Sequence, residues 1–156
     1  MKITPIEVGD KLPVFELLNQ KGELFNPSNL IGKKHLVLFF YPKDFTPGCI
    51  KEVCSFRDQY ETFVKHGVEV VGVSSDSKQS HQKFAEKYRL PFQILSDNEG
   101  KLRKLLGVPS SLFGLLPGRV TFVIDRNGTV MLKFNNQFGA EKHISESLKV
   151  LGIENK

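Results

Sequence analysis

The sequence predicts a three-layer α/β domain in which helices cover both faces of a central mixed sheet. Two apolar runs of strand length, HLVLFFY at 35–41 and VEVVGVS at 68–74, alternate with segments whose apolar residues recur at helical spacing. Alternation of this kind places helices on both faces of a sheet. Near the end of the chain an Asn127-Gly128 turn joins two further strands, and this antiparallel pair makes the sheet mixed.

Length and charge narrow the class of protein. The chain has 156 residues, of which 40% are apolar and 25% charged, so one domain spanning residues 1–156 is expected. The 22 Lys and Arg residues outnumber the 17 Asp and Glu residues, but they are dispersed, and we therefore expect no nucleic-acid partner. The longest apolar–aromatic run, Leu36 to Tyr41, is far shorter than the ~20 residues of a membrane span.

The first elements are predicted to be a hairpin and a buried strand. Short apolar pieces at 14–18 and 23–25 flank Asn-Gln-Lys-Gly at 19–22, a pattern typical of a β-hairpin. The run at 35–41 is continuous, with β-branched and aromatic residues, so we interpret it as a strand buried on both faces.

A helix is predicted to follow this strand directly. Thr46 suits the N-cap, Pro47 suits the first helical position, and Gly67 is suited to end the helix. Its apolar residues fall on one helical face: Val53, Phe56, Tyr60, Phe63 and Val64.

The second half of the chain continues the alternation. The pattern predicts strands at 68–74, 92–95, 119–125 and 130–134, and helices at 77–89, at 99–106 and around Ile144, Leu148 and Leu151. Residues 107–118 are rich in Gly, Pro and Ser and are predicted to be a loop.

The chemistry is predicted to lie where the strand at 35–41 gives way to the helix. Ligands of open α/β sheets bind beyond the carboxyl ends of strands, and Cys49 falls there, in the first helical turn. The free N–H groups and dipole of that turn stabilise a thiolate, which is the nucleophilic form of cysteine. A lone cysteine is more often a small core residue, but the nearby Thr46, Pro47, Gly48 and second cysteine favour a reactive one.

The second cysteine, Cys54, stands five residues after the first. In one regular helix the two Cα atoms lie about 8.7 Å apart, whereas a disulfide needs them within about 7 Å. The two sulfur atoms can therefore bond only if the first turns unwind. Cys54 is either a core residue or half of a redox switch coupled to local melting of the helix. Two cysteines, with four histidines lacking paired ligand spacing, predict no metal site.

Pro42, Thr46 and Cys49 match the signature P-x-x-x-[ST]-x-x-C, and on these residues the chain resembles the peroxiredoxin family. The similarity covers nearly the whole chain, including FYPKDFTPGC, CSFRD, GVSSDS, SLFGLLPGR and NNQF. The position of Cys54 resembles the bacterioferritin-comigratory-protein/PrxQ subgroup, and the loop and C-terminal pieces resemble its plant and cyanobacterial branch. The resemblance implies a thioredoxin-like fold and thiol peroxidase activity without metal, haem, flavin or other cofactor.

The resemblance also assigns roles to residues. It implies that Cys49 is the peroxidatic cysteine and Cys54 the resolving cysteine, that the Thr46 hydroxyl contacts thiolate and peroxide, and that Pro42 shields the site. Arg119 matches an arginine that reaches the site from a later strand. Elementary chemistry agrees, since a guanidinium keeps its charge and stabilises both thiolate and leaving oxygen.

Two positions carry less weight in this comparison. Glu52 matches an acidic residue often found three positions after the peroxidatic cysteine. Ile50 departs from the Thr that many members have, and it is not expected to touch the chemistry.

The expected reaction cycle consumes hydrogen peroxide and alkyl hydroperoxides. Sulfenic acid on Cys49 condenses with Cys54 to a disulfide, which an external dithiol, thioredoxin or else glutaredoxin, then reduces. The chain is expected to act as a monomer in the cytoplasm, or in a plastid if a transit peptide was removed. Two other functions stay open: a disulfide oxidoreductase, although such enzymes use Cys-x-x-Cys, and a non-enzymatic redox sensor.

Overall fold

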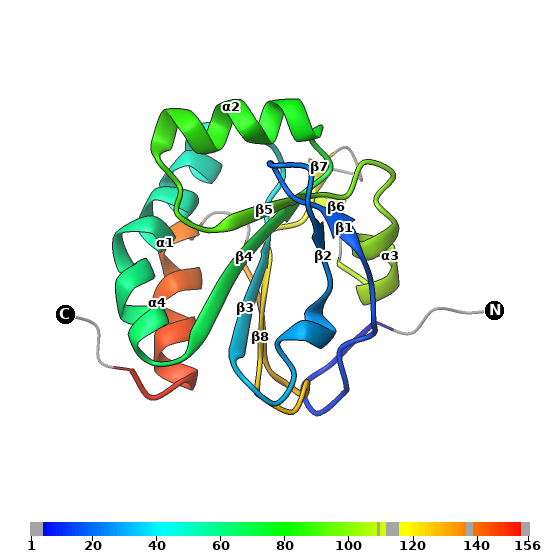
Figure 1. The fold of residues 1–156 in the computed structure, drawn as a ribbon, viewed down its shortest axis with the longest axis vertical. Coiled ribbons are helices and arrows are strands. Elements are labelled where there is room, and N and C mark those ends of the chain that lie inside the picture. The colour runs from blue at the N-terminus through cyan, green and yellow to red at the C-terminus, as the bar shows by residue number, and fades with distance from the viewer. Residues whose placement is uncertain (1–4, 109, 112–115, 137–138, 154–156) are drawn as a thin grey trace.

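The structure, a computed structural model, describes residues 5–108, 110–111, 116–136 and 139–153. A five-stranded sheet in the order β5-β4-β3-β8-β9 forms its centre (Figure 1). These strands are β3 (His35–Phe40), β4 (Val68–Ser74), β5 (Gln93–Ser96), β8 (Val120–Ile124) and β9 (Val130–Asn135). Strands β3, β4 and β5 are parallel, while β8 runs antiparallel to β3 and β9. The predicted mixed sheet is confirmed.

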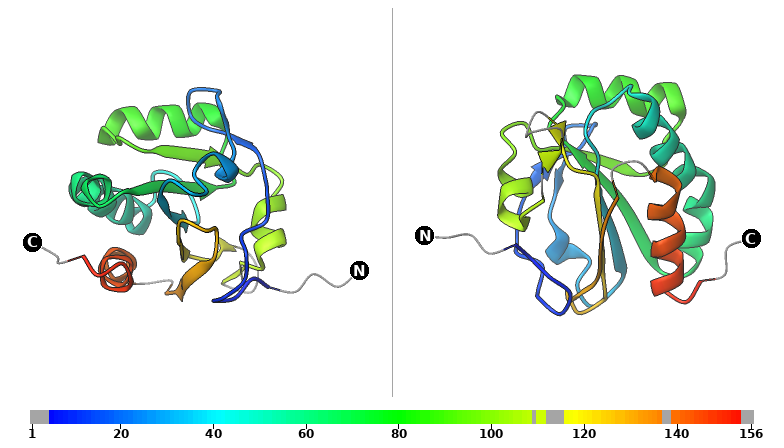
Figure 2. Two further views of the ribbon diagram at one scale, coloured as in Figure 1. Left: turned by 60° about the horizontal axis from the view of Figure 1, so that its bottom comes forward. Right: turned by 180° about the vertical axis from the view of Figure 1, so that it is seen from behind.

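Helices cover the two faces of the sheet unequally. Helices α1 (Pro47–Lys65), α2 (Lys78–Tyr88) and α4 (Ala140–Val150) pack on one face. The other face is covered by the short helix α3 (Lys101–Leu106) together with the N-terminal segment, which includes a 3-10 turn at Pro27–Asn29. Figure 2 shows α4 lying alongside α1. Among the described residues, no helix is long and apolar enough to cross a membrane.

Alternation along β3 sends side chains into both layers. Val37 and Phe39 point to the α1 side, where the ring of Phe39 stacks on that of Phe56 with centroids 4.4 Å apart. Phe40 points to the other side, where its ring meets that of Phe122 of β8 edge to face with centroids 6.0 Å apart. Continuous apolar sequence in β3 is thus explained by burial on both faces.

Two small two-stranded sheets lie outside the central sheet in the part of the chain that the structure describes, and only one of them was predicted. The predicted hairpin exists as β1 (Leu17–Leu18) paired antiparallel with β2 (Leu24–Phe25). Within the predicted loop 107–118, however, β6 (Ser110–Ser111) pairs with β7 (Leu116–Pro117). The prediction that this segment has no regular structure was therefore wrong. Two-residue ladders need backbone partners but no apolar periodicity, so sequence patterns do not reveal them.

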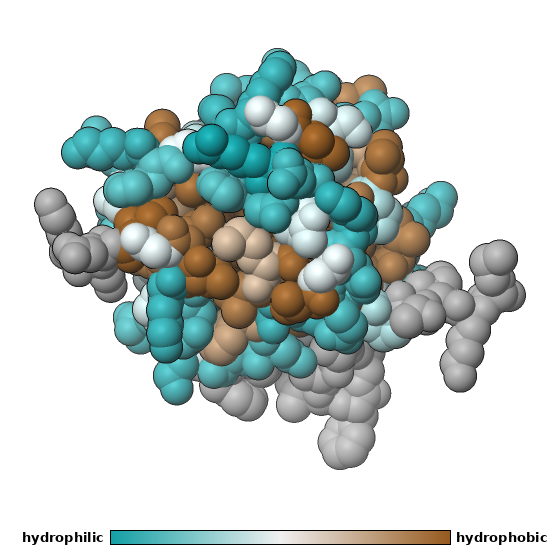
Figure 3. Space-filling model, turned by 90° about the horizontal axis from the view of Figure 1, so that it is seen from below, coloured by the Kyte–Doolittle hydropathy of each residue, from teal (hydrophilic) through white to brown (hydrophobic). Residues whose placement is uncertain are grey.

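A hydrophobic hollow opens at the end of the sheet where β3 begins. Its apolar lining residues are Leu12, Pro13, Val14, Pro27, Leu30, Ile31, Leu36 and Ile124. Figure 3, which views the molecule from below, shows hydrophobic side chains gathered on this face. Because β3 ends at the opposite edge of the sheet, the hollow lies far from the start of α1.

Gly72 in β4 leaves room for the stacked rings of the core. A Cβ atom there would lie 2.7 Å from Phe39 Cζ and 3.0 Å from Ile94 Cγ2. We expect Gly72→Ala to lower the free energy of unfolding by about 1–3 kcal/mol, because the core is overpacked. Urea unfolding measures this loss. Phe39→Leu removes the clashing ring atom, so the double variant should lose less than the sum of the single variants. Unchanged stability in Gly72→Ala would contradict the prediction.

Candidate active site

The loop from β3 to α1 and the first turn of α1 hold three of the residues predicted for the site. Pro42 is buried two residues after the end of β3, and Thr46 is at the N-cap of α1. Pro47 takes the first helical position, and the Ile50 N–H donates to the Thr46 carbonyl at 2.9 Å. Cys49 is therefore in the first turn, fully buried, where helical N–H groups lack partners within the helix.

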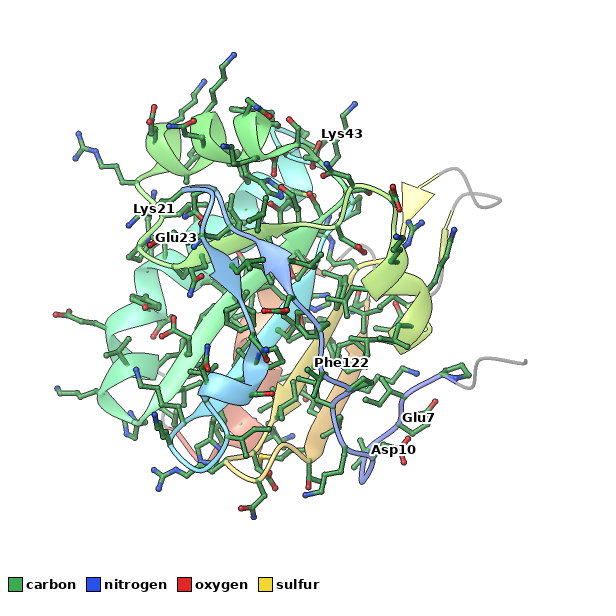
Figure 4. All side chains as sticks on the ribbon, turned by 45° about the vertical axis from the view of Figure 1, so that its right-hand side comes forward. Glu7, Asp10, Lys21, Glu23, Lys43 and Phe122 are labelled. Carbon is green, nitrogen blue, oxygen red and sulfur yellow. The ribbon has the colours of Figure 1, made fainter. Side chains whose placement is uncertain are left out.

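The hydroxyl of Thr46 does not cap the helix. Although Thr46 occupies the N-cap, its Oγ1 donates instead to the carbonyl of Lys43 at 2.8 Å. That bond uses the hydroxyl proton and leaves the oxygen lone pairs available as acceptors. Lys43 itself points outward at the edge of the molecule (Figure 4). The expected capping bond is thus absent from the described contacts of Thr46, and its hydroxyl is oriented by the loop.

Arg119 brings a positive charge to Cys49 from the residue before β8. Its Nη2 donates to Cys49 Sγ at 3.5 Å, and its Nη1 donates to Glu52 Oε1. Burial works against the charged form, but Glu52 and Cys49 outweigh it and raise the pKa of Arg119. A Cβ at Gly48 would lie 3.0 Å from Nη2, so glycine at this position lets the guanidinium approach. A fixed cation beside sulfur favours its ionised form.

Glu52 lies at the other end of the same guanidinium. Its side chain is fully buried, and burial raises the pKa of Glu52 to about 8, although Arg119 opposes the shift. Its second oxygen, Oε2, is 3.7 Å from Nδ1 of His143 on α4. The sequence comparison gave this acid little weight, yet in the structure it holds the arginine that contacts Cys49.

Cys54 lies in the same unbroken helix as Cys49, and both are free thiols. It is half-buried and packs against the core on the α1 side. Burial raises the pKa of the Cys54 thiol, with Arg57 opposing this effect. Because α1 is continuous from Pro47 to Lys65, the two sulfur atoms can meet only after its first turns open.

A buried network of polar side chains anchors the loop between β3 and α1. Asp44 accepts from the Tyr41 hydroxyl at 2.7 Å and the Ser80 hydroxyl at 2.9 Å, and its Oδ2 lies 2.7 Å from His81 Nδ1. His81 Nε2 donates to the Leu95 carbonyl at 2.9 Å. Burial, and then the neighbouring Asp44, raises the pKa of Tyr41 well above its usual value, so the phenol stays a donor.

The same network reaches β4. Asp76 Oδ2 accepts from the backbone N–H of Asp44 at 2.8 Å and from the Ser74 hydroxyl at 2.6 Å. Ligand atoms of Asp44, Asp76 and His81 lie within 4.8 Å of one another, a spacing that a metal ion also requires. These atoms already bond to protein groups, so the arrangement serves to anchor the loop to α2 and β4.

Comparison with known proteins identifies the family of this site. Residues 8–133 match the AhpC/TSA family. The chain belongs to this family. It is 56% identical over 143 residues to "Peroxiredoxin Q, chloroplastic" of Sedum lineare. The aligned region covers 92% of this chain and 76% of that protein. The predicted membership in the peroxiredoxins, with similarity to the PrxQ subgroup, is confirmed.

Solved structures of AhpC/TSA-type proteins share the fold. Peroxidoxin BcpB of Mycobacterium tuberculosis superimposes with a TM-score of 0.87 at 37% identity, covering 96% of this chain and 99% of that one. The bacterioferritin comigratory protein of Xanthomonas campestris gives a TM-score of 0.77 at 30% identity, covering 86% and 90%. The predicted thioredoxin-like fold, with its mixed sheet and hairpin, is confirmed.

Sequence reasoning did not identify two buried histidines near these residues, His81 beside Asp44 and His143 beside Glu52. The histidines were considered only as metal ligands, and their spacing along the chain does not fit a metal site. A better signal was available, since His81 shares an apolar helical stripe with Phe84 and Ala85, and His143 precedes Ile144 on the apolar face of α4. A histidine on a buried stripe needs polar partners, and these partners point to the site.

Proposed function

We propose that Cys49 performs the chemistry of this chain, which is a thioredoxin-dependent thiol peroxidase of the peroxiredoxin family. The observation that carries the proposal is the contact between Arg119 Nη2 and Cys49 Sγ in the first turn of α1. A helix N-terminus and a guanidinium both stabilise a negative charge on the sulfur. Relatives named Peroxiredoxin Q support the same activity.

The peroxide step transfers one oxygen atom to sulfur. The Cys49 thiolate attacks one peroxide oxygen, so the S–O bond forms while the O–O bond breaks and the other oxygen leaves with the electron pair. The leaving oxygen takes up a proton and departs as water or an alcohol. Arg119 stabilises the negative charge as it moves from sulfur to oxygen. We assign Thr46 to orient the peroxide through its hydroxyl, and Pro42 to shield the site from water.

The second half of the cycle restores the thiol. Cys54 attacks the sulfenic acid of Cys49, which releases water and forms a disulfide. This step requires the first turns of α1 to open, since both cysteines belong to one continuous helix. A dithiol of the thioredoxin type then reduces the disulfide by exchange, and glutaredoxin is the second reductant that we propose.

The proposed substrates are hydrogen peroxide and alkyl hydroperoxides. Phe45, next to Thr46, keeps 43% of its surface exposed and packs edge to face on Phe84 at 5.0 Å. Its φ of 62° is unfavourable for a bulky residue, so the loop holds this ring outward against a conformational cost. An apolar ring beside the site suits the organic part of an alkyl hydroperoxide. A solved relative from Xanthomonas campestris is described by its alkyl peroxide reduction activity.

We propose that the chain works as one domain and as a monomer, without nucleic-acid or membrane partners. Cys49, Cys54 and Arg119 all come from a single chain, which supports a complete site in a monomer. Light scattering after gel filtration tests this assembly state. For the compartment, we propose the cytoplasm or the plastid, and the chloroplastic relatives support the plastid.

The function is tested by peroxide consumption in the presence of thioredoxin, thioredoxin reductase and NADPH. A peroxidase should consume NADPH in proportion to added peroxide, with rapid loss of thiol after stopped-flow mixing. A disulfide oxidoreductase would lose thiol slowly with peroxide but reduce a protein disulfide. A redox sensor would form the disulfide yet turn over slowly with every reductant, and either outcome would overturn the proposal.

The Thr46 hydroxyl offers a matched pair of variants. Thr46→Val keeps the shape but removes the hydroxyl, and we expect peroxide attack to slow by about 10²-fold, as for other single oriented polar groups in active sites. Thr46→Ser keeps the hydroxyl and should react within a few-fold of wild type. Stopped-flow thiol oxidation measures both rates. Equal losses in the two variants would exclude a role for the hydroxyl.

A further inference from the structure

One buried oxygen beside the reactive cysteine is unexplained by the peroxidase cycle. Glu52 uses Oε1 to accept from Arg119, but its Oε2 is buried and has no hydrogen-bond partner among the residues that the structure describes. A bare carboxylate oxygen in this position is costly, because burial strips its water and nothing replaces it. A proton on or next to Oε2 would remove that cost.

The second titratable side chain beside this oxygen is the ring of His143. Its Nε2 lies 2.8 Å from the Asn136 carbonyl, which can only accept, so Nε2 carries a proton. Its Nδ1 lies 3.7 Å from Glu52 Oε2 and 2.7 Å from the Thr121 hydroxyl. Glu52, Thr121 and His143 are all fully buried. A neutral His143 therefore presents the lone pair of Nδ1 toward Glu52.

The hydroxyl of Thr121 suits either location of a proton in this cluster. A hydroxyl both donates and accepts, so Thr121 can donate to a bare Nδ1 or accept from a protonated one. The 3.7 Å between Oε2 and Nδ1 is longer than a hydrogen bond. A small rotation of the carboxyl group brings the two atoms together, and active-site bonds often tighten in this way during reaction.

Titration of the two groups is consistent with one proton between them. Burial raises the pKa of Glu52 to about 8, and burial, with Arg119, lowers the pKa of His143 to about 4. Between these values the pair as a whole is neutral, with the proton on the carboxyl group. If the proton moves to Nδ1, the pair is a neutral carboxylate–imidazolium pair, and its total charge is unchanged.

The charge of this pair matters because the described groups that face Glu52 include only one cation of fixed charge. Cys49 lies on the same helix, Arg119 is the residue before β8, and His143 belongs to α4. Lys51 and Glu141 also join α1 to α4, but they form an exposed pair at the surface. With Glu52 ionised and His143 neutral, Arg119 would be shared by two anions, the Glu52 carboxylate and the Cys49 thiolate. It would then stabilise negative charge on the Cys49 sulfur less strongly.

We propose that Glu52 and His143 together hold one buried proton during the peroxide reaction, and that His143 is a positioning residue that keeps the charge of Arg119 available to Cys49. The consequence for catalysis depends on the proposed peroxidase function, whereas the shared proton does not. The shared proton supplies a partner for the buried Oε2, and His143 of α4 acquires a role although it is remote in sequence from Cys49.

Infrared spectroscopy of the reduced protein tests the shared proton without any turnover. Wild type should show the C=O stretch of a protonated carboxylic acid at neutral pH, lost on titration through about pH 8. Glu52→Gln should remove this band, while Glu141→Gln, which changes an exposed acid, should not. His143→Leu removes the acceptor for the proton, so the band should disappear about one pH unit lower.

A second variant separates this effect from simple damage to the fold. His143→Gln can donate its amide to the Asn136 carbonyl and accept from Glu52 through its oxygen, so the band should return to its wild-type titration. The rate constant for Cys49 oxidation should show the same order, with its decline at alkaline pH moved about one pH unit lower in His143→Leu and restored in His143→Gln.

Two results would overturn the inference: no Glu52-dependent band in wild type, or an unchanged titration in a folded His143→Leu protein. Both are independent of peroxidase activity. If the band behaves as expected but the protein fails to consume peroxide, the proposed function fails and the shared proton stands.

Discussion

Cys49→Ser is expected to reduce peroxide turnover to the background rate. A serine hydroxyl stays protonated at neutral pH and is a far weaker nucleophile than a thiolate, even next to Arg119 and a helix N-terminus. The substitution is nearly isosteric in a fully buried position, so the fold should persist. The thioredoxin-coupled assay measures the loss, and circular dichroism checks the fold. Residual turnover above background would place the attacking sulfur elsewhere.

Cys54→Ser is the matched control, since it changes the other thiol of the same helix. This variant should consume one equivalent of peroxide rapidly and then stop, because the sulfenic acid on Cys49 has no internal thiol to attack it. Mass spectrometry should find one added oxygen on Cys49, trapped by a sulfenic-acid reagent. Sustained turnover with thioredoxin would show that the reductant attacks Cys49 directly and that Cys54 has no resolving role.

Removal of the guanidinium should give the second large effect. In Arg119→Met the thiolate and the leaving oxygen both lose their nearest cation, and we expect the rate of peroxide attack to fall by about 10²–10³-fold. Arg119→Lys keeps a positive charge but loses the fork that reaches both Cys49 and Glu52, so it should fall between wild type and Arg119→Met. Stopped-flow oxidation of Cys49 measures all three.

Arg119→Met should also destabilise the protein in a pH-dependent way. The pKa of Glu52 is raised to about 8 in the folded protein, so the folded state binds a proton that the unfolded state has already released. Stability therefore falls as pH rises from the unfolded value of 4.5 through about 8. Without Arg119 an ionised Glu52 is buried without a counter-charge, which costs about 3–5 kcal/mol, so the loss should be greatest at alkaline pH.

The double variant Arg119→Met/Glu52→Gln separates the two consequences. With no carboxylate to bury, it should recover most of the stability lost at alkaline pH, as measured by urea unfolding. It should remain slow toward peroxide, because the cation beside Cys49 is still missing. Recovery of the peroxide rate along with stability would show that Arg119 acts through folding and contributes little to the reaction.

The succession of elements was largely predictable from sequence. A continuous apolar run predicted the strand at 35–41, and Pro47 together with apolar residues at helical spacing predicted the helix after it. The structure has β3 and α1 at these places. These signals are local, since they depend on the spacing of apolar residues along the chain and on backbone groups within a few residues of one another. The β6–β7 pair was not predictable, because a two-residue ladder leaves no periodic signal.

Local order in the chain places Thr46, Cys49 and Cys54 relative to one another, because helix geometry sets which residues share a turn and which lie too far apart to bond. Arg119, His81 and His143 join them only through folding. The register of β8 beside β3 brings Arg119 to α1, and the packing of α4 on α1 sets His143 beside Glu52. The family resemblance anticipated the place of Arg119. The spacing of residues along the chain does not, because contacts between residues so distant in sequence arise from burial and charge in three dimensions.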